Sequence, residues 1–267
     1  MAENSRIEWT DHTANLWWGC VKVHAGCDHC YAEALSHRYG KKLWGPGTSR
    51  QFVKSVWKDL TRYQKLAAEA GRIDRVFVGS MMDIFEKAMP VVDAKGEPVF
   101  DAPHGMVERL YTGMIREELF ENIRDGFYPN LVFLLLTKRH TNIRKMVPQE
   151  WLMNPPRNVM FGASAVDQRT YDAVAVMLDS LKIEYGYKTF ISMEPQLEHI
   201  ALNPYLKLDW LIQGGESGGK KRPFDVGWAE SMMLQCARLG IPYFFKQIDK
   251  VQDIPEHLRV QQFPLIH

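Results

Sequence analysis

Three of the four cysteines lie close together in the segment CVKVHAGCDHCY, which runs from Cys20 to Tyr31. Cys20, Cys27 and Cys30 have the spacing C-x6-C-x2-C. Thiolates are strong ligands for zinc and for iron–sulfur clusters. Three thiolates on one loop would hold such a centre and leave one coordination position open. The spacing therefore predicts a metal or cluster site on this loop.

Two kinds of centre fit three cysteines. Structural zinc usually takes four protein ligands, and His24 or His29 would supply the fourth. A [4Fe–4S] cluster on three cysteines has one iron free for another ligand, an arrangement suited to a cluster that takes part in chemistry. The remaining cysteine, Cys236, lies on the apolar face of a predicted helix, and we interpret it as a buried core thiol.

Polar residues end the apolar runs of the chain, and these are the second group that could do chemistry. In parallel α/β proteins the carboxyl ends of the strands form the active-site face, so we expect these side chains to meet at one mouth. They are Ser80, Asp83, Thr137, Lys138, Arg139, Ser164, Asp167, Ser192, Glu194, Glu216, Ser217, Lys246 and Gln247.

Several of these residues also have a plain structural interpretation. Ser164 and Thr137 would each cap a following helix, and Lys246 would be a surface lysine. We favour a functional role for Glu194, because a carboxylate directly after an apolar strand is costly to bury without a partner. The two glycines before Glu216 would form a tight turn or let the backbone approach a ligand closely.

The elements that must position these groups are short apolar runs separated by stretches with helical patterning. The runs are rich in Val, Ile, Leu and Phe, which is typical of strands buried on both faces. This alternation predicts an α/β fold with a parallel sheet, open or closed, in a single domain of residues 1–267. The predicted strands are Leu16–Gly19, Val76–Gly79, Leu131–Leu136, Val159–Ala163, Thr189–Ser192, Trp210–Gly214 and Tyr243–Lys246.

Helical spacing of apolar residues predicts helices at Tyr31–Tyr39, before Gly71, around Met106–Arg124 and at Asp225–Leu239. The connection Glu86–Pro129, between the second and third strands, is unusually long. A long insertion in a compact domain is often a lid or a recognition element.

Composition excludes several classes of protein. The chain has 267 residues, 46% of them apolar, and a net charge of +1, so no global basic field attracts nucleic acid. The first residues do not have the pattern of a signal peptide, and no stretch approaches the roughly 18 apolar residues of a membrane span. Clustered cysteines in a chain this long do not indicate a disulfide framework. We expect a cytoplasmic protein with no membrane contact.

A series of short segments, taken in order, resembles the radical S-adenosylmethionine (SAM) superfamily, and within it the phage and bacterial three-Cys-motif proteins. The first gap between cysteines departs from the usual C-x3-C, and His29 stands where an aromatic residue is usual. We expect Val21–Gly26 to bulge without adding a ligand. The matching segments are Ile7–Asp11, Gly19–Glu33, Val76–Phe85, Leu134–Arg139, Phe190–Pro195, Asp209–Gly218, Arg222–Phe224 and Pro242–Gln247.

The resemblance implies a partial or complete TIM-like (β/α) barrel with a [4Fe–4S] cluster on Cys20, Cys27 and Cys30. SAM would bind the free iron, and its reductive cleavage would give a 5′-deoxyadenosyl radical that abstracts hydrogen. A flavodoxin- or ferredoxin-type donor would supply the electron. The implied cofactor-binding residues are His29, Tyr31, Ser80, Asp83, Thr137, Lys138, Ser164, Ser192 and Glu194. The implied substrate-binding residues are Glu216, Ser217, Lys246 and Gln247, with Glu194, Glu216 and Lys246 as the catalytic candidates.

Phage relatives suggest a DNA substrate, such as a thymine carrying an amino-acid adduct that an isomerase rearranges, in the cytoplasm of the host. Basic clusters interleaved with aromatic residues would hold a backbone and stack an extruded base. These segments are Arg38–Lys42, Arg50–Lys54 and Lys220–Arg222, with Trp44, Phe52 and Trp57. Solvated lysines beside partly buried aromatic rings are the plainer interpretation. The alternative functions are a zinc- or cluster-bearing nucleic-acid-binding module and a radical enzyme acting on a peptide or small metabolite.

Overall fold

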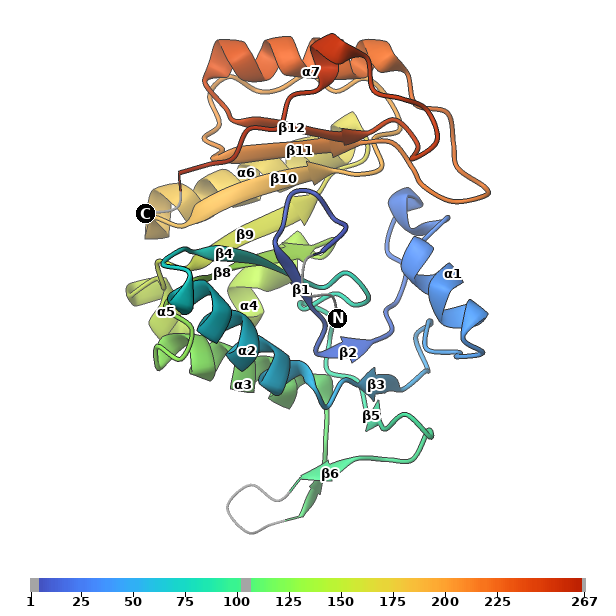
Figure 1. Cartoon of the computed structure of the whole chain (residues 1–267), viewed down its shortest axis with the longest axis vertical. Helices are drawn as coiled ribbons and strands as arrows, with labels where there is room; N and C mark the ends of the chain where they lie inside the picture. Colours follow the sequence, from blue (N-terminus) through green and yellow to red (C-terminus); the bar gives the residue numbers. More distant parts are fainter. Residues whose placement is uncertain (1–4, 102–106, 266–267) are drawn as a thin grey trace.

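The computed structural model describes residues 5–101 and 107–265, and its centre is a seven-stranded sheet curled into a half-barrel (Figure 1). Every strand runs parallel to its neighbours, and the two edge strands, β1 and β12, do not pair with each other. The predicted parallel α/β sheet is confirmed in this form. In sheet order the strands are β1 (His12–Ala14), β4 (Asp74–Val78), β8 (Leu131–Thr137), β9 (Val159–Ser164), β10 (Lys188–Met193), β11 (Trp210–Gly214) and β12 (Tyr243–Gln247).

The first strand lies earlier in the chain than predicted. β1 ends at Ala14, whereas Leu16–Gly19 contains β2 (Trp17–Trp18), a strand of a separate small sheet with β3 (Arg50–Phe52) and β5 (Val91–Val92). The prediction was wrong because Leu16 and Trp17 are apolar for another reason: both are fully buried in the core. Cys20 therefore follows β2 rather than a strand of the half-barrel.

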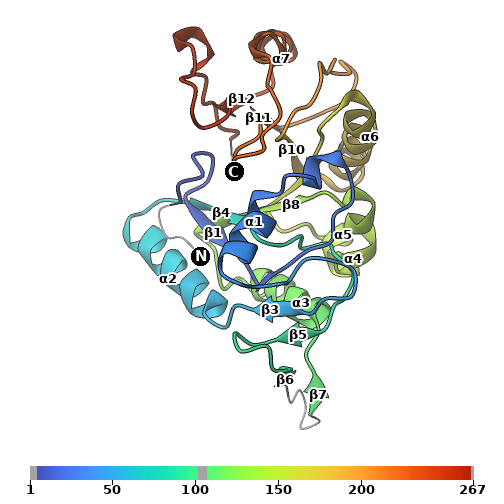
Figure 2. The ribbon, with the colours of Figure 1, turned by 90° about the vertical axis from the view of Figure 1, so that its right-hand side faces the viewer.

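Helices cover the outer face of the half-barrel, except for the first, which lies by the carboxyl ends of the strands (Figures 1 and 2). The predicted helices at Tyr31–Tyr39 and Asp225–Leu239 are confirmed almost to the residue. The main helices are α1 (Tyr31–Arg38), α2 (Val56–Glu69), α3 (Thr112–Arg124), α6 (Gln168–Tyr185) and α7 (Val226–Leu239), with short helices α4 (Ile143–Met146) and α5 (Gln149–Met153).

Asp167, one of the polar residues after the strands, is a helix cap. Its side chain accepts a hydrogen bond from the N–H of Thr170 at 2.8 Å, and the Thr170 hydroxyl accepts one from the N–H of Asp167 at 3.1 Å. This reciprocal capping box fixes the start of α6. Asp167 therefore belongs to the fold.

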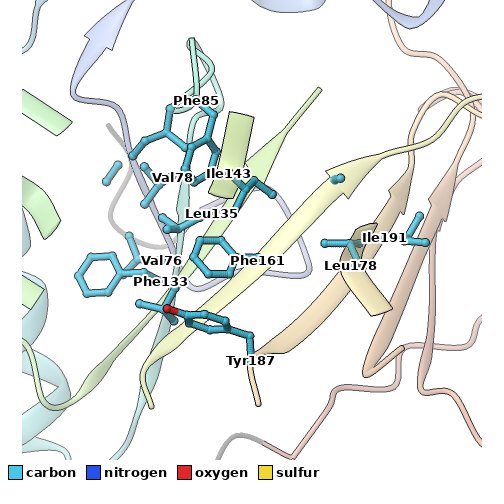
Figure 3. Close-up of a cluster of buried hydrophobic side chains, with 14 of the residues drawn as sticks. Val76, Val78, Phe85, Phe133, Leu135, Ile143, Phe161, Leu178, Tyr187 and Ile191 are labelled. Atoms are coloured by element: carbon cyan, nitrogen blue, oxygen red, sulfur yellow. The ribbon is translucent and has the colours of Figure 1, made fainter. Parts of the chain in front are cut away.

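Alternate strand residues point to opposite faces of the sheet, which builds two apolar clusters. On the outer face, Val76, Phe133 and Phe161 pack under the helices (Figure 3). On the inner face, Trp9 lies 4.6 Å from Phe77 and 6.2 Å from Trp210, measured between ring centroids. The segment before β1 thus fills the interior of the half-barrel, where Trp9 covers the apolar residues of the inner face.

The insertion between β4 and β8 is smaller than predicted. Within Glu86–Pro129, the helix α3 is an ordinary crossover helix, because Leu119 and Phe120 are fully buried in the outer core. It begins at Thr112; the predicted start lies outside the described residues. The added part contains β5, β6 (Phe100–Asp101) and β7 (Glu108–Arg109), and β6 and β7 project from the end of the molecule opposite α7 (Figures 1 and 2).

None of the described helices has the length and apolar character needed to cross a membrane.

Candidate functional site

A cavity of about 310 Å³ opens at the carboxyl ends of the strands. Its wall contains every residue predicted to bind the cluster, SAM or the substrate except Gln247, so the structure brings side chains from six strand ends and the cysteine loop into one space. Arg139 and Asp167, which were also expected at this mouth, do not line the cavity. The predicted residues that line it are Cys20, Cys27, His29, Cys30, Tyr31, Ser80, Asp83, Thr137, Lys138, Ser164, Ser192, Glu194, Glu216, Ser217 and Lys246. The catalytic and binding roles assigned to them stay predictions.

Gln247 is the predicted substrate-binding residue that lies outside the cavity wall. Its side-chain amide donates to the carbonyl of Gly215 at 2.9 Å and is buried. The Gly215 N–H donates in turn to the Gln247 carbonyl at 3.0 Å. Gln247 therefore joins the ends of β11 and β12 and does not line the cavity.

The cysteine loop starts from a backbone position that favours glycine. Gly19 has φ +118°, and a Cβ there would lie 2.4 Å from the carbonyl oxygen of Leu43. Beyond Cys20 the chain bulges, and Nδ1 of His24 accepts a hydrogen bond from the N–H of Gly26 at 3.1 Å. His24 does not line the cavity. The six residues between Cys20 and Cys27 thus form a turn that is stabilised by a hydrogen bond between two of its own residues.

The thiols share a cavity but are not arranged as a finished metal site. Within residues 5–101 and 107–265, no group of three or more His, Cys, Asp and Glu side chains is placed to hold a metal ion. All the cysteines are free thiols. Burial and the nearby Asp83 raise the pKa of Cys20 to about 12, against the opposing effect of Arg139. Cys20 is therefore a neutral thiol here, and binding a metal would require it to lose its proton.

Asp83 is the centre of the polar network on the β8 side of the cavity. It accepts hydrogen bonds from the Thr137 hydroxyl at 2.6 Å, from the N–H of Lys138 at 3.1 Å and from the Arg139 guanidinium at 2.7 Å. The carboxylate is buried but fully satisfied. The three consecutive polar residues at the end of β8, Thr137, Lys138 and Arg139, therefore act as one cradle for Asp83.

Arg139 connects this cradle to the cysteine loop, and sequence reasoning assigned it no role. One guanidinium nitrogen lies 3.5 Å from Sγ of Cys20, and the other donates to the carbonyl of Val21 at 2.6 Å. A positive group beside Cys20 favours the thiolate form. The only sequence signal was the position of Arg139 directly after a strand.

Arg50 does not belong to a nucleic-acid-binding cluster, as its neighbours in the sequence had suggested. Its side chain is fully buried and makes two hydrogen bonds of 2.8 Å to the carboxylate of Glu86. The guanidinium also donates to the carbonyl oxygens of Leu43 at 3.0 Å and Thr48 at 2.8 Å. Arg50 thus holds together the loop that packs against Gly19.

The other predicted basic clusters are also partly engaged within the protein. Lys41 donates to the side chain of Gln51, and Lys221 lies 2.7 Å from the carboxylate of Asp249. Among the aromatic residues, Trp44 lines the cavity, whereas Phe52 and Trp57 pack against the core. The described residues of these segments therefore do not form a continuous basic groove.

Glu216 joins the β11 side of the cavity to the cysteine loop. It accepts hydrogen bonds from Nδ1 of His29 at 2.9 Å and from the Arg222 side chain at 2.5 and 3.1 Å. Burial raises the pKa of Glu216, but the hydrogen bonds from Arg222 and His29 outweigh burial and hold the pKa at about 2. Arg222 also donates to the carbonyl of Ala25 at 3.0 Å. Glu216, a predicted substrate-binding residue, is therefore already bonded to His29 and Arg222, and these bonds attach it to the cysteine loop.

Three further contacts complete the wall. Lys246 pairs with Glu194, and both side chains are mostly buried. The Tyr31 hydroxyl donates to the carbonyl of Ser80 at 2.7 Å, which ties α1 to the end of β4. The ammonium group of Lys138 donates to the Ser164 hydroxyl at 3.2 Å.

Comparison with known proteins identifies a family but no activity. The model of one protein family, described as a protein of unknown function (DUF5131), matches residues 4–103 and 105–260. No curated protein and no solved structure matches the chain.

The assignment to the radical SAM superfamily and to the three-Cys-motif proteins is therefore wrong. The matching model is of another family, no model of a radical SAM family matches, and the described residues contain no cysteine cluster arranged for an iron–sulfur centre. The short segments that suggested the assignment are explained in part by the fold: Trp9 fills the half-barrel, and Asp83, Glu194 and Glu216 are held in ion pairs.

Proposed function

The chain belongs to the DUF5131 family of proteins of unknown function, and from its site we propose that it is an enzyme that binds a [4Fe–4S] cluster and SAM. Cys20, Cys27 and Cys30 would hold the cluster. One observation supports this most: the three thiols line the same cavity as the polar residues at the strand ends. A purely structural metal site would have no need of that cavity.

The donor set fits a cluster that keeps one position open. Sulfur donors from a single loop are the usual ligands of iron–sulfur clusters. Arg139, 3.5 Å from Cys20, supplies a positive charge beside a ligand that must ionise. Because the described side chains do not form a group that is placed to hold a metal ion, the loop between Gly19 and α1 would have to adjust to bind a cluster.

If Cys20, Cys27 and Cys30 held such a cluster, its chemistry would be one-electron reduction of SAM to methionine and a 5′-deoxyadenosyl radical, which would remove a hydrogen atom from a substrate. The chain's own task is to hold the reactants and exclude water. Lys138 is suited to the SAM carboxylate, because its ammonium group bonds to a neutral hydroxyl rather than to a carboxylate. Asp83 orients Arg139 and the end of β8. Glu194 and Lys246 face the same space from β10 and β12.

The finer architecture belongs to this proposal. We interpret the curled sheet as a partial TIM-like (β/α) barrel. No described residue of 86–129 lines the cavity, which favours a recognition element over a lid for that insertion. A modified thymine in DNA, a peptide and a small metabolite stay the predicted substrate classes, and a flavodoxin- or ferredoxin-type protein stays the predicted electron donor.

A zinc site is the second candidate, and one contact favours it. His29 bonds to Glu216 through Nδ1, which leaves Nε2 free. A carboxylate behind the histidine is the usual support of a zinc ligand. His29 with the three cysteines would then close a four-ligand zinc site in a nucleic-acid-binding module without enzymatic activity.

Anaerobic reconstitution with iron and sulfide distinguishes the two. We expect the wild type and Cys236→Ala to bind iron and sulfide and, after reduction with SAM, to form 5′-deoxyadenosine. Cys236 is the matched control because it is buried on α7 and does not line the cavity. Cys20→Ala should lose both properties. Tightly bound zinc with no 5′-deoxyadenosine, or unchanged iron content in Cys20→Ala, would overturn the proposal.

A further inference from the structure

Two loops at the rim of the cavity are tied together at both ends. At the strand ends, the main chain and side chain of Gln247 bond to Gly215, at 3.0 and 2.9 Å. A Cβ on Gly215 would lie 2.0 Å from the carbonyl oxygen of Ile248, so only glycine permits this approach. Farther out, Lys221 lies 2.7 Å from Asp249. The loop after β11 therefore lies directly beside the loop after β12.

Lys250, in the second of these loops, has an unusual backbone. Its φ is +66°, and in the part of the chain described here no other residue except glycine has a positive φ. Asp249 imposes the turn, since its Oδ1 accepts hydrogen bonds from the N–H groups of Val251 at 2.9 Å and Gln252 at 2.7 Å. Such strain is characteristic of functional positions that the surrounding structure determines. Here the result is that Lys250 lines the cavity.

The charges of the cavity leave the ammonium group of Lys250 unmatched. Each carboxylate in the wall has its own cation: Asp83 pairs with an arginine, Glu194 with a lysine and Glu216 with another arginine. Lys138 bonds to a hydroxyl. Lys250 makes no ion pair or hydrogen bond with any residue that the structure describes. The rim therefore has an excess positive charge.

The neighbouring turn adds unused hydrogen-bond donors. No described residue accepts a hydrogen bond from the N–H groups of Ser217, Gly218 or Gly219. Gly218 has φ +110°, and nothing lies within 4 Å of the Cβ positions of Gly218 and Gly219. Consecutive free N–H groups in a glycine-rich turn are suited to binding an anion.

We propose that Lys250 and the Ser217–Gly219 turn form a binding site for a phosphate group of the substrate. A phosphate offers more acceptor oxygens than a carboxylate, which suits donors supplied by two neighbouring loops, from which Ser217 and Lys250 both line the cavity. Trp44, in the wall of the same cavity, supplies a surface on which a base can stack. The inferred substrate is therefore a nucleotide, free or within a polynucleotide. That this phosphate site serves catalysis rests on the proposed function, but phosphate binding itself does not require the cluster.

Binding to the cluster-free protein tests this inference. We would measure the affinities of thymidine 5′-phosphate, thymidine and a short thymidylate oligonucleotide by calorimetry. Thymidine 5′-phosphate or the oligonucleotide should bind about ten-fold more tightly than thymidine, and Lys250→Met should remove most of that difference. The tighter of the two phosphorylated ligands identifies the source of the phosphate.

Lys250→Gly is the second variant, because glycine accepts the left-handed backbone without strain while the charged side chain is removed; it should match Lys250→Met. Lys65→Met, on an exposed lysine of α2, is the control and should bind like the wild type. Equal affinities for thymidine and its phosphates, or full phosphate preference in both Lys250 variants, would overturn the inference. Retained phosphate binding without 5′-deoxyadenosine formation would refute the proposed function alone.

Discussion

Replacing Arg50 tests whether this residue belongs to the fold or to a nucleic-acid surface. Its guanidinium is fully buried, with two bonds of 2.8 Å to Glu86 and further bonds to the Leu43 and Thr48 carbonyls. Arg50→Met removes the main cation of a carboxylate whose side chain is 3% exposed. The nearest remaining cation, Arg139, is 3.5 Å from that carboxylate.

The expected cost is large because a buried charge would lose its partner. Breaking a buried ion pair on one side typically costs about 3–5 kcal/mol of the free energy of unfolding. Removing both charges in Arg50→Met/Glu86→Leu should cost much less than the sum of the two single changes. The remaining loss, about 1–3 kcal/mol, is that of the carbonyl oxygens left without a donor. Exposed Lys54, from the same sequence cluster, is the control, and Lys54→Met should change stability by less than about 0.5 kcal/mol.

Urea denaturation of the wild type, the single variants and the double variant gives these values as a double-mutant cycle. A loss below about 1 kcal/mol in Arg50→Met, together with weaker binding of DNA, would show that Arg50 is a surface contact and that the reasoning is wrong.

Three further predictions concern the site. Gly19→Ala should destabilise the protein by about 1–3 kcal/mol and lower its iron uptake, because a Cβ would lie 2.4 Å from the Leu43 carbonyl oxygen. The control is Gly47→Ala, where nothing lies within 4 Å of the added Cβ, and thermal denaturation of this variant should match that of the wild type. The pKa of Glu216 is lowered to about 2, so the stability that its ion pairs supply is full above about pH 4.5 and is lost as the pH falls toward 2. Glu216→Gln should flatten that part of the pH–stability curve, and an unchanged slope would contradict the assignment. Lys246→Met leaves the Glu194 carboxylate without its cation, so it should reduce 5′-deoxyadenosine formation at least about ten-fold without changing the iron content. Product formation at the wild-type rate would exclude a role for the Lys246–Glu194 pair.

The strand ends were predictable because their signal is local. An apolar run followed by a polar residue identifies a buried parallel strand and its carboxyl end, and this prediction is confirmed for β4, β8, β9, β10, β11 and β12. The first strand failed because Leu16 and Trp17 are buried in the core without pairing in the half-barrel. Burial alone does not distinguish these two environments in a sequence.

The roles of charged residues were less predictable because their partners are distant in the sequence. His29 and Glu216 are separated by 187 residues, and Arg50 and Glu86 by 36. Arg50 beside Lys54 indicated a basic surface, although burial and a carboxylate partner make Arg50 structural. The assignment to the radical SAM superfamily failed for a related reason. The short segments that suggested it contain strand ends and residues of ion pairs, and such features occur in unrelated proteins as well.

The most direct test of the central claim is the electron paramagnetic resonance spectrum of the reconstituted, reduced protein, recorded with and without SAM. If Cys20, Cys27 and Cys30 hold a cluster with one open position, SAM should change the spectrum, and Cys236→Ala should behave like the wild type. A cluster spectrum that is identical in the presence and absence of SAM, or no cluster signal at all, would contradict the account.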